Sequence, residues 1–164
     1  MNYGRILNFD TANGEGIRVT LFVSGCPHHC PECQNPMTWD EGYGEPFTQD
    51  VADGIIQKLK KPFISGLTIS GGEPLAPSNL LWVTGLAKAV KQQTGKSIWL
   101  YTGYTWDYVK LTAANALKYV DVLVDGQFIA AQKDMRLKWR GSANQRVIDV
   151  PKSLNANRVV LWCD

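Results

Sequence analysis

The chain has 164 residues, of which 45% are hydrophobic, so it is long enough to form one domain around a buried core. Its net charge of +2 does not indicate a nucleic-acid partner. No apolar run approaches the roughly 20 residues of a membrane span, and the N-terminus lacks a secretory signal pattern. Three of the four cysteines fall in one short loop rather than in a disulfide framework. We therefore expect a cytoplasmic protein with no nucleic-acid or membrane partner.

The first part of the chain contains one predicted strand, a long loop and one predicted helix. Residues 17–23 are rich in β-branched and aromatic side chains, which is typical of a buried strand. The loop that follows extends to about Pro46, since Gly42 and Gly44 interrupt any regular pattern. Thr48 is a suitable N-cap for the helix. Behind it, apolar residues recur at helical spacing: Val51, Ile55, Ile56 and Leu59.

The rest of the chain alternates between predicted strands and helices. Ser78 is the expected cap of a helix that ends at Gly95. Thr105 is the expected cap of a further helix that extends to Leu117. The apolar face of the helix after Ser78 is Leu81, Leu86, Ala87 and Val90. Strands are predicted at residues 66–70, 97–101 and 120–124, and later strands at 146–150 and 158–162.

This alternation predicts the fold class. Strands separated by helices form βαβ units with a parallel sheet, and a complete eight-unit barrel needs about 200 residues or more. We therefore expect an α/β fold in a single domain, a partial and open βα barrel with a parallel sheet. Residues 26–33, 71–74, 102–104 and 125–128 follow the ends of predicted strands. In such sheets ligands bind at that edge, so these four segments should face one site.

The most distinctive segment is the cysteine loop, residues 25–36, in which Cys26, Cys30 and Cys33 have the spacing C-x3-C-x2-C. Thiolates suit iron–sulfur clusters, zinc and copper(I). Structural zinc sites have four protein ligands and electron-transfer clusters generally use four cysteines, but no fourth cysteine is nearby. In a [4Fe–4S] cluster one iron would remain free to bind another molecule. Zinc stays an alternative, with the distant Cys163 or a loop histidine as fourth ligand, although we expect both histidines to be exposed to solvent.

A second motif, Gly71-Gly72-Glu73-Pro74, follows a predicted strand. Glycines let the backbone approach a ligand closely, and the carboxylate of Glu73 can accept hydrogen bonds from an ammonium group. By itself the motif also fits an ordinary turn between a strand and a helix. Its expected position beside the cysteine loop favours a shared binding site.

These two motifs together resemble those of the radical S-adenosylmethionine superfamily. Further segments are similar to the activating proteins of the anaerobic ribonucleoside-triphosphate reductases; they are residues 13–18, 22–26, 101–104, 124–128 and 139–145. The resemblance extends from about Tyr3 to Asp149. It implies that residues 1–150 form an activase domain of the radical S-adenosylmethionine type. Residues 151–164 would be a C-terminal tail outside the family pattern.

The resemblance also implies a specific chemistry. A [4Fe–4S] cluster would bind the amino and carboxylate groups of S-adenosylmethionine at its open iron. Reductive cleavage would give methionine and a 5′-deoxyadenosyl radical, which would take a hydrogen atom from a glycine of the partner reductase. A low-potential donor such as flavodoxin would supply the electron, because reducing a sulfonium requires a low cluster potential.

The site residues follow from the same resemblance. The implied cluster ligands are Cys26, Cys30 and Cys33, and the implied cofactor-binding residues are Glu32, Cys33, Gln34, Gly71, Gly72 and Glu73. The residues of the glycine motif would meet the methionyl amino group. Residues 102–104 are weaker candidates for the adenosine side. The superfamily often places an aromatic residue before the third cysteine, and Glu32 stands there in this chain.

Two other functions remain open at this point. One is a radical enzyme acting on a small molecule, similar to carboxy-deazaguanine synthase, although 164 residues leave little chain to enclose a substrate. The other is a metal-binding interaction module without catalysis. A basic stretch from Lys133 to Arg146 surrounds Trp139, and it either docks the reductase or is a solvated surface.

Overall fold

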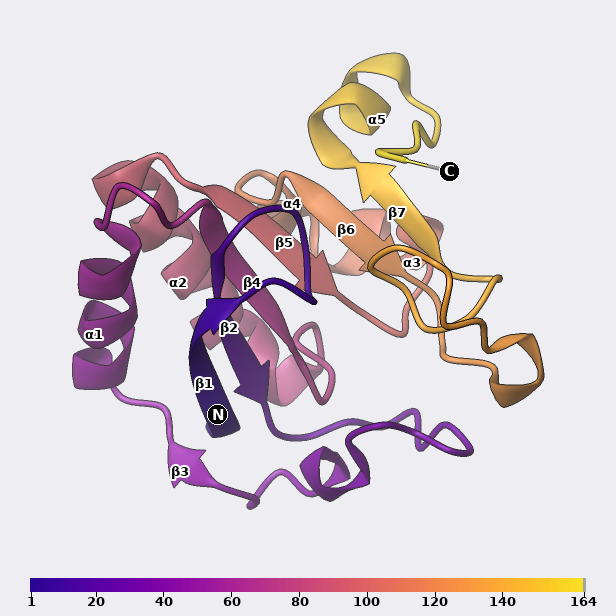
Figure 1. The fold of residues 1–164 in the computed structure, drawn as a ribbon, viewed down its shortest axis with the longest axis horizontal. Helices are drawn as coiled ribbons and strands as arrows, with labels where there is room; N and C mark the ends of the chain where they lie inside the picture. The colour runs from indigo at the N-terminus through magenta and orange to yellow at the C-terminus, as the bar shows by residue number, and fades with distance from the viewer. Residues whose placement is uncertain (164) are drawn as a thin grey trace.

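One seven-stranded sheet organises the molecule, with the helices on one of its faces (Figure 1). The computed structural model describes residues 1–163. The strands lie in the spatial order β3-β1-β2-β4-β5-β6-β7. In chain order the elements are β1 (Asn2–Asp10), β2 (Arg18–Val23), η1 (Pro36–Trp39), β3 (Glu45–Pro46), α1 (Gln49–Leu59), β4 (Gly66–Gly71), α2 (Pro77–Thr94), β5 (Ser97–Tyr101), α3 (Trp106–Thr112), α4 (Ala114–Leu117), β6 (Val122–Asp125), η2 (Ala130–Gln132), β7 (Arg146–Asp149) and α5 (Val150–Ala156).

The centre of the sheet is parallel and its borders are antiparallel. Strands β2, β4, β5 and β6 pair in parallel, whereas β1 runs antiparallel to β2 and β3, and β7 runs antiparallel to β6. The α/β class and the open sheet are confirmed, and the expected parallel sheet is found in the central strands but not at the two borders. Parallel neighbours need a crossover of a dozen or more residues. Residues 11–17, which connect β1 to β2, are too few for such a crossover, so these two strands pair antiparallel. The partial-barrel geometry of the radical S-adenosylmethionine type stays a prediction.

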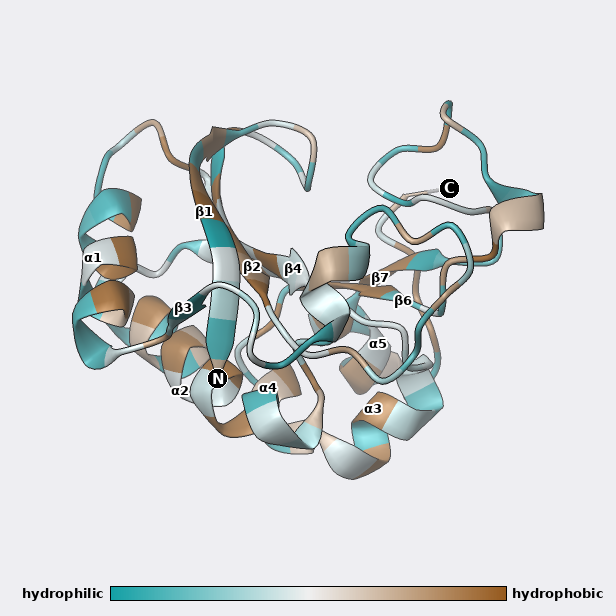
Figure 2. Ribbon diagram, turned by 90° about the horizontal axis from the view of Figure 1, so that it is seen from below, coloured by the Kyte–Doolittle hydropathy of each residue, from teal (hydrophilic) through white to brown (hydrophobic). Residues whose placement is uncertain are grey.

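Alternating side chains give the sheet two different faces. On β2, the fully buried Val19, Leu21 and Val23 pack in the main core, which also contains the apolar residues of the helices. Figure 2 shows the hydrophobic side of α1 and α2 turned toward the sheet. The intervening residues, such as Arg18 and Phe22, point to the opposite face. No α-helix of residues 1–163 packs on that face, so a cavity can form there.

The helices confirm most of the expected caps. Thr48 caps α1 and accepts a hydrogen bond from the N–H of Val51, and Gly95 ends α2 in the left-handed conformation. However, α2 begins at Pro77, because proline suits the first turn of a helix, and Ser78 is therefore not its cap. The predicted apolar face is wrong at Leu81, which is 82% exposed, while the other three predicted residues are buried.

Three further expectations differ from the structure. The helix after Thr105 is broken at Ala113 into α3 and α4. The strand expected at residues 158–162 is reduced to a single bridge between Ile148 and Leu161. Strand β1 was not expected, because its mostly half-exposed residues lack a buried apolar run.

The division into a domain of residues 1–150 and a tail stays a prediction. No helix within residues 1–163 has the length and apolar character needed to cross a membrane.

Candidate cluster and cofactor site

A cavity of about 640 Å³ opens on the sheet face that the helices leave uncovered. The cysteine loop and the ends of β4 and β5 form one side, and the loop of residues 126–145 forms the other. Phe22 and Ser70 line it from the sheet itself. The size is typical of a site for a small molecule. The four segments expected at one edge therefore do meet around one space.

Most of the residues implied as ligands line this cavity. They are Cys26, Cys30, Cys33, Gln34, Gly71, Gly72 and Glu73, and Thr102 and Gly103 join them from the end of β5. Glu32 and Tyr104 do not line it. Glu32 is exposed and takes a left-handed conformation with φ of 57° in the turn before Cys33. A contact between Glu32 and a cofactor stays a prediction.

The three cysteines are free thiols, each partly exposed toward the cavity. Burial raises the pKa of Cys26 and of Cys30, so the thiols favour their neutral form until a metal replaces the proton. No three His, Cys, Asp or Glu side chains of residues 1–163 are grouped for a single metal ion. In a [4Fe–4S] cluster each thiolate binds a different iron. Three soft donors along one cavity wall therefore fit three corners of such a cluster.

Both glycines of the turn after β4 are required by close backbone contacts. Gly71 has φ of 100°, and a Cβ there would lie 2.6 Å from the carbonyl oxygen of Val23. A Cβ on Gly72 would lie 2.6 Å from the carbonyl oxygen of Gly25. The N–H of Glu73 donates to the same Gly25 carbonyl at 2.7 Å. The turn is thus fastened to the residue that precedes the first cysteine.

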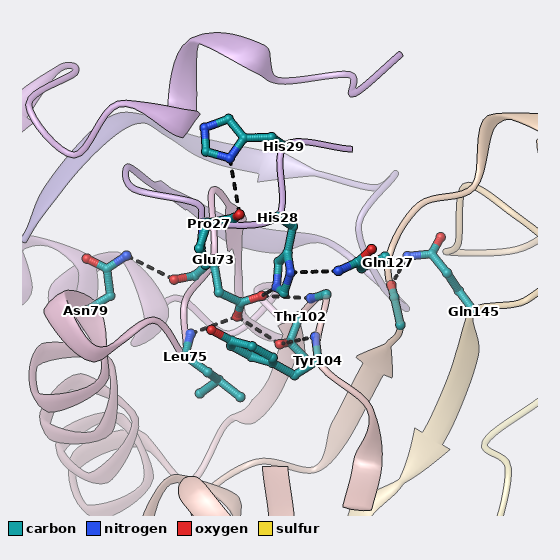
Figure 3. A network of polar contacts seen from close by, with 12 residues as sticks. Pro27, His28, His29, Glu73, Leu75, Asn79, Thr102, Tyr104, Gln127 and Gln145 are labelled. Atoms are coloured by element: carbon teal, nitrogen blue, oxygen red, sulfur yellow. Dashed lines mark hydrogen bonds and ion pairs between the residues drawn. The ribbon is translucent and has the colours of Figure 1, made fainter. Parts of the chain in front are cut away.

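The carboxylate of Glu73 is fully buried and accepts four hydrogen bonds (Figure 3). The N–H of Leu75 and the hydroxyl of Thr102 donate to Oε1 at 2.9 and 2.8 Å. The N–H of Gly103 and the imidazole Nε2 of His28 lie 2.7 and 2.9 Å from Oε2. A carboxylate offers about four acceptor positions. In this arrangement the protein occupies all of them.

His28 and Gln127 are the residues that sequence reasoning missed. The His28 side chain is 9% exposed, so the expectation of a solvent-exposed loop histidine is wrong for this residue. Its Nδ1 lies 2.9 Å from Nε2 of Gln127 in the opposite loop (Figure 3). The expectation is correct for His29, which is exposed; its Nδ1 lies 3.1 Å from the carbonyl oxygen of Pro27, and its ring packs against Trp39. No local pattern distinguishes the two histidines; only their packing does.

The opposite wall carries the basic stretch. Arg146 is paired with Asp125, and Arg136 with Asp134, so these charges are partly neutralised. Arg140 lines the cavity, and its buried Nε has no hydrogen-bond partner among the described residues. Trp139 packs edge-on against Trp99 of the sheet and holds the base of this loop.

Comparison with known proteins supports this site. Residues 12–148 match the family described as a 4Fe-4S single cluster domain. The chain is 48% identical over 148 residues to the anaerobic ribonucleoside-triphosphate reductase-activating protein of Vibrio cholerae, covering 88% of this chain and 96% of that protein. It is 43% identical over 150 residues to the protein of that name in Escherichia coli, covering 90% and 97%. This chain belongs to the anaerobic ribonucleoside-triphosphate reductase-activating protein family.

Membership of the activating-protein family bears on two alternatives, a binding module without catalysis and a zinc site. The similarity is sustained in a third member, from Haemophilus influenzae, at 45% identity over 148 residues, 88% of this chain and 96% of that protein. The resemblance inferred from the motifs is confirmed. The chain is an activating enzyme rather than a binding module without catalysis, and its 4Fe-4S domain favours an iron–sulfur cluster over zinc.

Proposed function

We propose that the chain is a radical S-adenosylmethionine activase that forms a glycyl radical on an anaerobic ribonucleoside-triphosphate reductase. One observation carries the proposal: the three cysteines and the Gly71–Gly72 turn line one cavity in a chain whose relatives are named activating proteins of that reductase. A cluster with three protein ligands beside a glycine turn suits binding of S-adenosylmethionine at the open iron.

Each part of the cavity has a role in this proposal. Cys26, Cys30 and Cys33 would hold the cluster, and the backbone of Gly71 and Gly72 would hold the methionyl part of the cofactor. Gln34 lines the same wall and would contact the cofactor beside the cluster. When bound, the cluster and S-adenosylmethionine would supply a 5′-deoxyadenosyl radical that takes a hydrogen atom from a glycine. Phe22 and Tyr101 of the sheet line the cavity and would exclude water from the reacting bond.

The loop of residues 126–145 is the proposed contact for the reductase. It forms the wall opposite the cysteines, so a glycine segment of the partner would enter between the two. Met135 is 84% exposed on this loop and offers an adaptable apolar contact. A low-potential donor such as flavodoxin would reduce the cluster. We place this chemistry in the reducing cytoplasm, where free thiols persist.

Anaerobic reconstitution tests the function. The protein should bind about four irons and four sulfides per chain. After reduction with S-adenosylmethionine it should release methionine and 5′-deoxyadenosine, and adding the reductase should give a glycyl radical signal in electron paramagnetic resonance. Omitting S-adenosylmethionine is the control. Bound zinc without cofactor cleavage would contradict the proposal, and cleavage without a glycyl radical would favour a small-molecule substrate.

A further inference from the structure

The four donors to Glu73 come from three separate segments of the chain. His28 lies between the first two cysteines, Leu75 follows the glycine turn, and Thr102 and Gly103 follow β5. Because β2, β4 and β5 run in parallel, the segments that follow them leave the sheet at the same edge. A fully buried carboxylate is costly unless it is completely hydrogen-bonded, so the four contacts hold the segments in one arrangement.

The contacts of His28 occupy both of its ring nitrogens. The amide nitrogen of Gln127 lies 2.9 Å from Nδ1, and an amide nitrogen can only donate. Nδ1 is therefore the acceptor, and Nε2 carries the proton that is donated to Glu73 at 2.9 Å. Tyr104 packs edge-on against the imidazole with ring centroids 4.6 Å apart, which fixes the plane of the ring. Both ring nitrogens are occupied, so neither is available to bind a metal.

We infer that His28 is a positioning residue, whose hydrogen bond to Glu73 holds the cysteine loop against the cofactor-binding turn. We call the Glu73 carboxylate and its four hydrogen-bond donors the bracket. This inference rests on the proposed function, because it concerns how the chain prepares its cluster site. Glu73 then serves the internal geometry of the site, since its acceptor positions are filled by the protein. The methionyl ammonium group would be held by the backbone of Gly71 and Gly72 rather than by the Glu73 carboxylate.

Two substitutions at His28 separate its two hydrogen bonds. In His28→Gln the amide nitrogen replaces Nε2 and can still donate to Glu73. In His28→Asn the amide reaches only the position of Nδ1, so the contact with Gln127 can survive but the contact with Glu73 is lost. The matched control is His29→Gln, because His29 is a neighbouring histidine of the same loop without a contact to the bracket.

The measurement is cluster stability in the reconstituted protein, which requires no turnover. We expect His28→Asn to release iron to a chelator on the order of 10–100 times faster than the wild type, a range typical of residues that orient metal ligands. His28→Gln and His29→Gln should stay within about twofold of the wild type, because hydrogen-bonded orientation of the loop is kept. An unchanged rate for His28→Asn overturns the inference, as does equal loss in His28→Gln, which would make the imidazole itself essential.

Glu73→Gln gives a second and independent measurement. An amide would present its NH₂ group to one of the two pairs of donors, either Leu75 with Thr102 or Gly103 with His28. The bracket should therefore open, and both cluster retention and binding of S-adenosylmethionine should fall. If Glu73 only bound the ammonium group, cluster retention would be normal and cofactor affinity alone would fall, which overturns the inference. A wild type that keeps its cluster through His28 but never cleaves S-adenosylmethionine would contradict the proposed function and leave the inference intact.

Discussion

Two fully buried charges lie near opposite ends of the parallel strands, and they are satisfied in different ways. Arg18, 1% exposed at the start of β2, donates five hydrogen bonds to neutral oxygens. Four of these oxygens belong to Thr68, Leu67 and Ser97 on the neighbouring strands. Glu73, beyond the end of β4, accepts instead from groups of three loop segments around the cavity.

The partners of the two charges indicate that Arg18 supports folding and that Glu73 supports function. Four of the five acceptors of Arg18 belong to residues of β4 and β5, so this charge fastens β2 to these two strands. Burial lowers the pKa of Arg18 to about 10, and it remains charged at neutral pH. The partners of Glu73 are the segments that line the site, so this charge shapes the cavity. Substitutions should therefore damage stability at the Arg18 end and cluster binding at the Glu73 end.

The largest effect on cluster binding should come from replacing the cysteines of the cysteine loop, with Cys163 as the comparison. Cys33→Ala, at the cavity, should abolish the cluster because a thiolate ligand is lost, and Cys26→Ala and Cys30→Ala should do the same. Cys163→Ala should keep a full cluster, since Cys163 packs against the hydrophobic cluster of Trp99, Val122, Val124 and Val147 and is not among the residues that line the cavity. Iron and sulfide analysis after reconstitution measures both. Loss of the cluster in Cys163→Ala would contradict the assignment of the three loop cysteines as the cluster ligands.

The next effect is on stability. Arg18→Met keeps an unbranched side chain to about the position of Nε but removes the guanidinium that donates to the oxygens of Thr68 and Ser97. We expect the free energy of unfolding of the cluster-free protein to fall by about 3 kcal/mol. Urea denaturation measures it, and the iron content per folded chain should not change. A loss below about 1 kcal/mol would mean that Arg18 does not fasten the strands.

Sequence reasoning reached the ligands of the site but not its internal support. The cysteine spacing and the glycine motif are local patterns, and each lies at the end of a strand that could be predicted from its apolar run. The contacts of His28 with Glu73 and Gln127 span 45 and 99 residues of sequence. No periodicity specifies such pairs, because they exist only once three loops have been brought together by the sheet.

Strand β1 and the surface of α2 also could not be predicted correctly from local sequence patterns. Buried strands such as β4 and β5 were predictable from β-branched and apolar residues, whereas β1 was missed because half-exposed strands alternate weakly. Leu81 was misplaced because α2 is apolar over much of its surface, so spacing alone could not decide which side meets the sheet. Tertiary packing, rather than propensity, made these choices.

A smaller effect is expected from an added methyl group. Gly72→Ala would place a Cβ against the carbonyl oxygens of Gly25 and Thr38, at 2.6 and 2.9 Å, and push the cysteine loop away from the turn. We expect a cost of about 1–3 kcal/mol in unfolding free energy, as for other overpacked sites, with faster iron release. Gly54→Ala in α1 is the matched control, since nothing lies within 4 Å of its Cβ position. It should stabilise the protein by about 0.5–1 kcal/mol, because alanine favours helices. Equal behaviour of the two variants would contradict the close packing of turn and loop.

The smallest effect concerns Asp10, which supports the Arg18 end. Burial raises the pKa of Asp10, but hydrogen bonds from Thr20, Asn13 and the N–H of Ala12 outweigh it and hold that pKa below its usual value. A carboxyl whose pKa is lowered by folding stabilises the protein above its unfolded pKa of about 4 and loses this contribution as the pH falls through the folded pKa. The wild type should therefore exceed Asp10→Asn in urea midpoint most clearly near pH 6, and the difference should shrink toward pH 3. A difference independent of pH would show that shape, not the charge of Asp10, supports this end of the sheet.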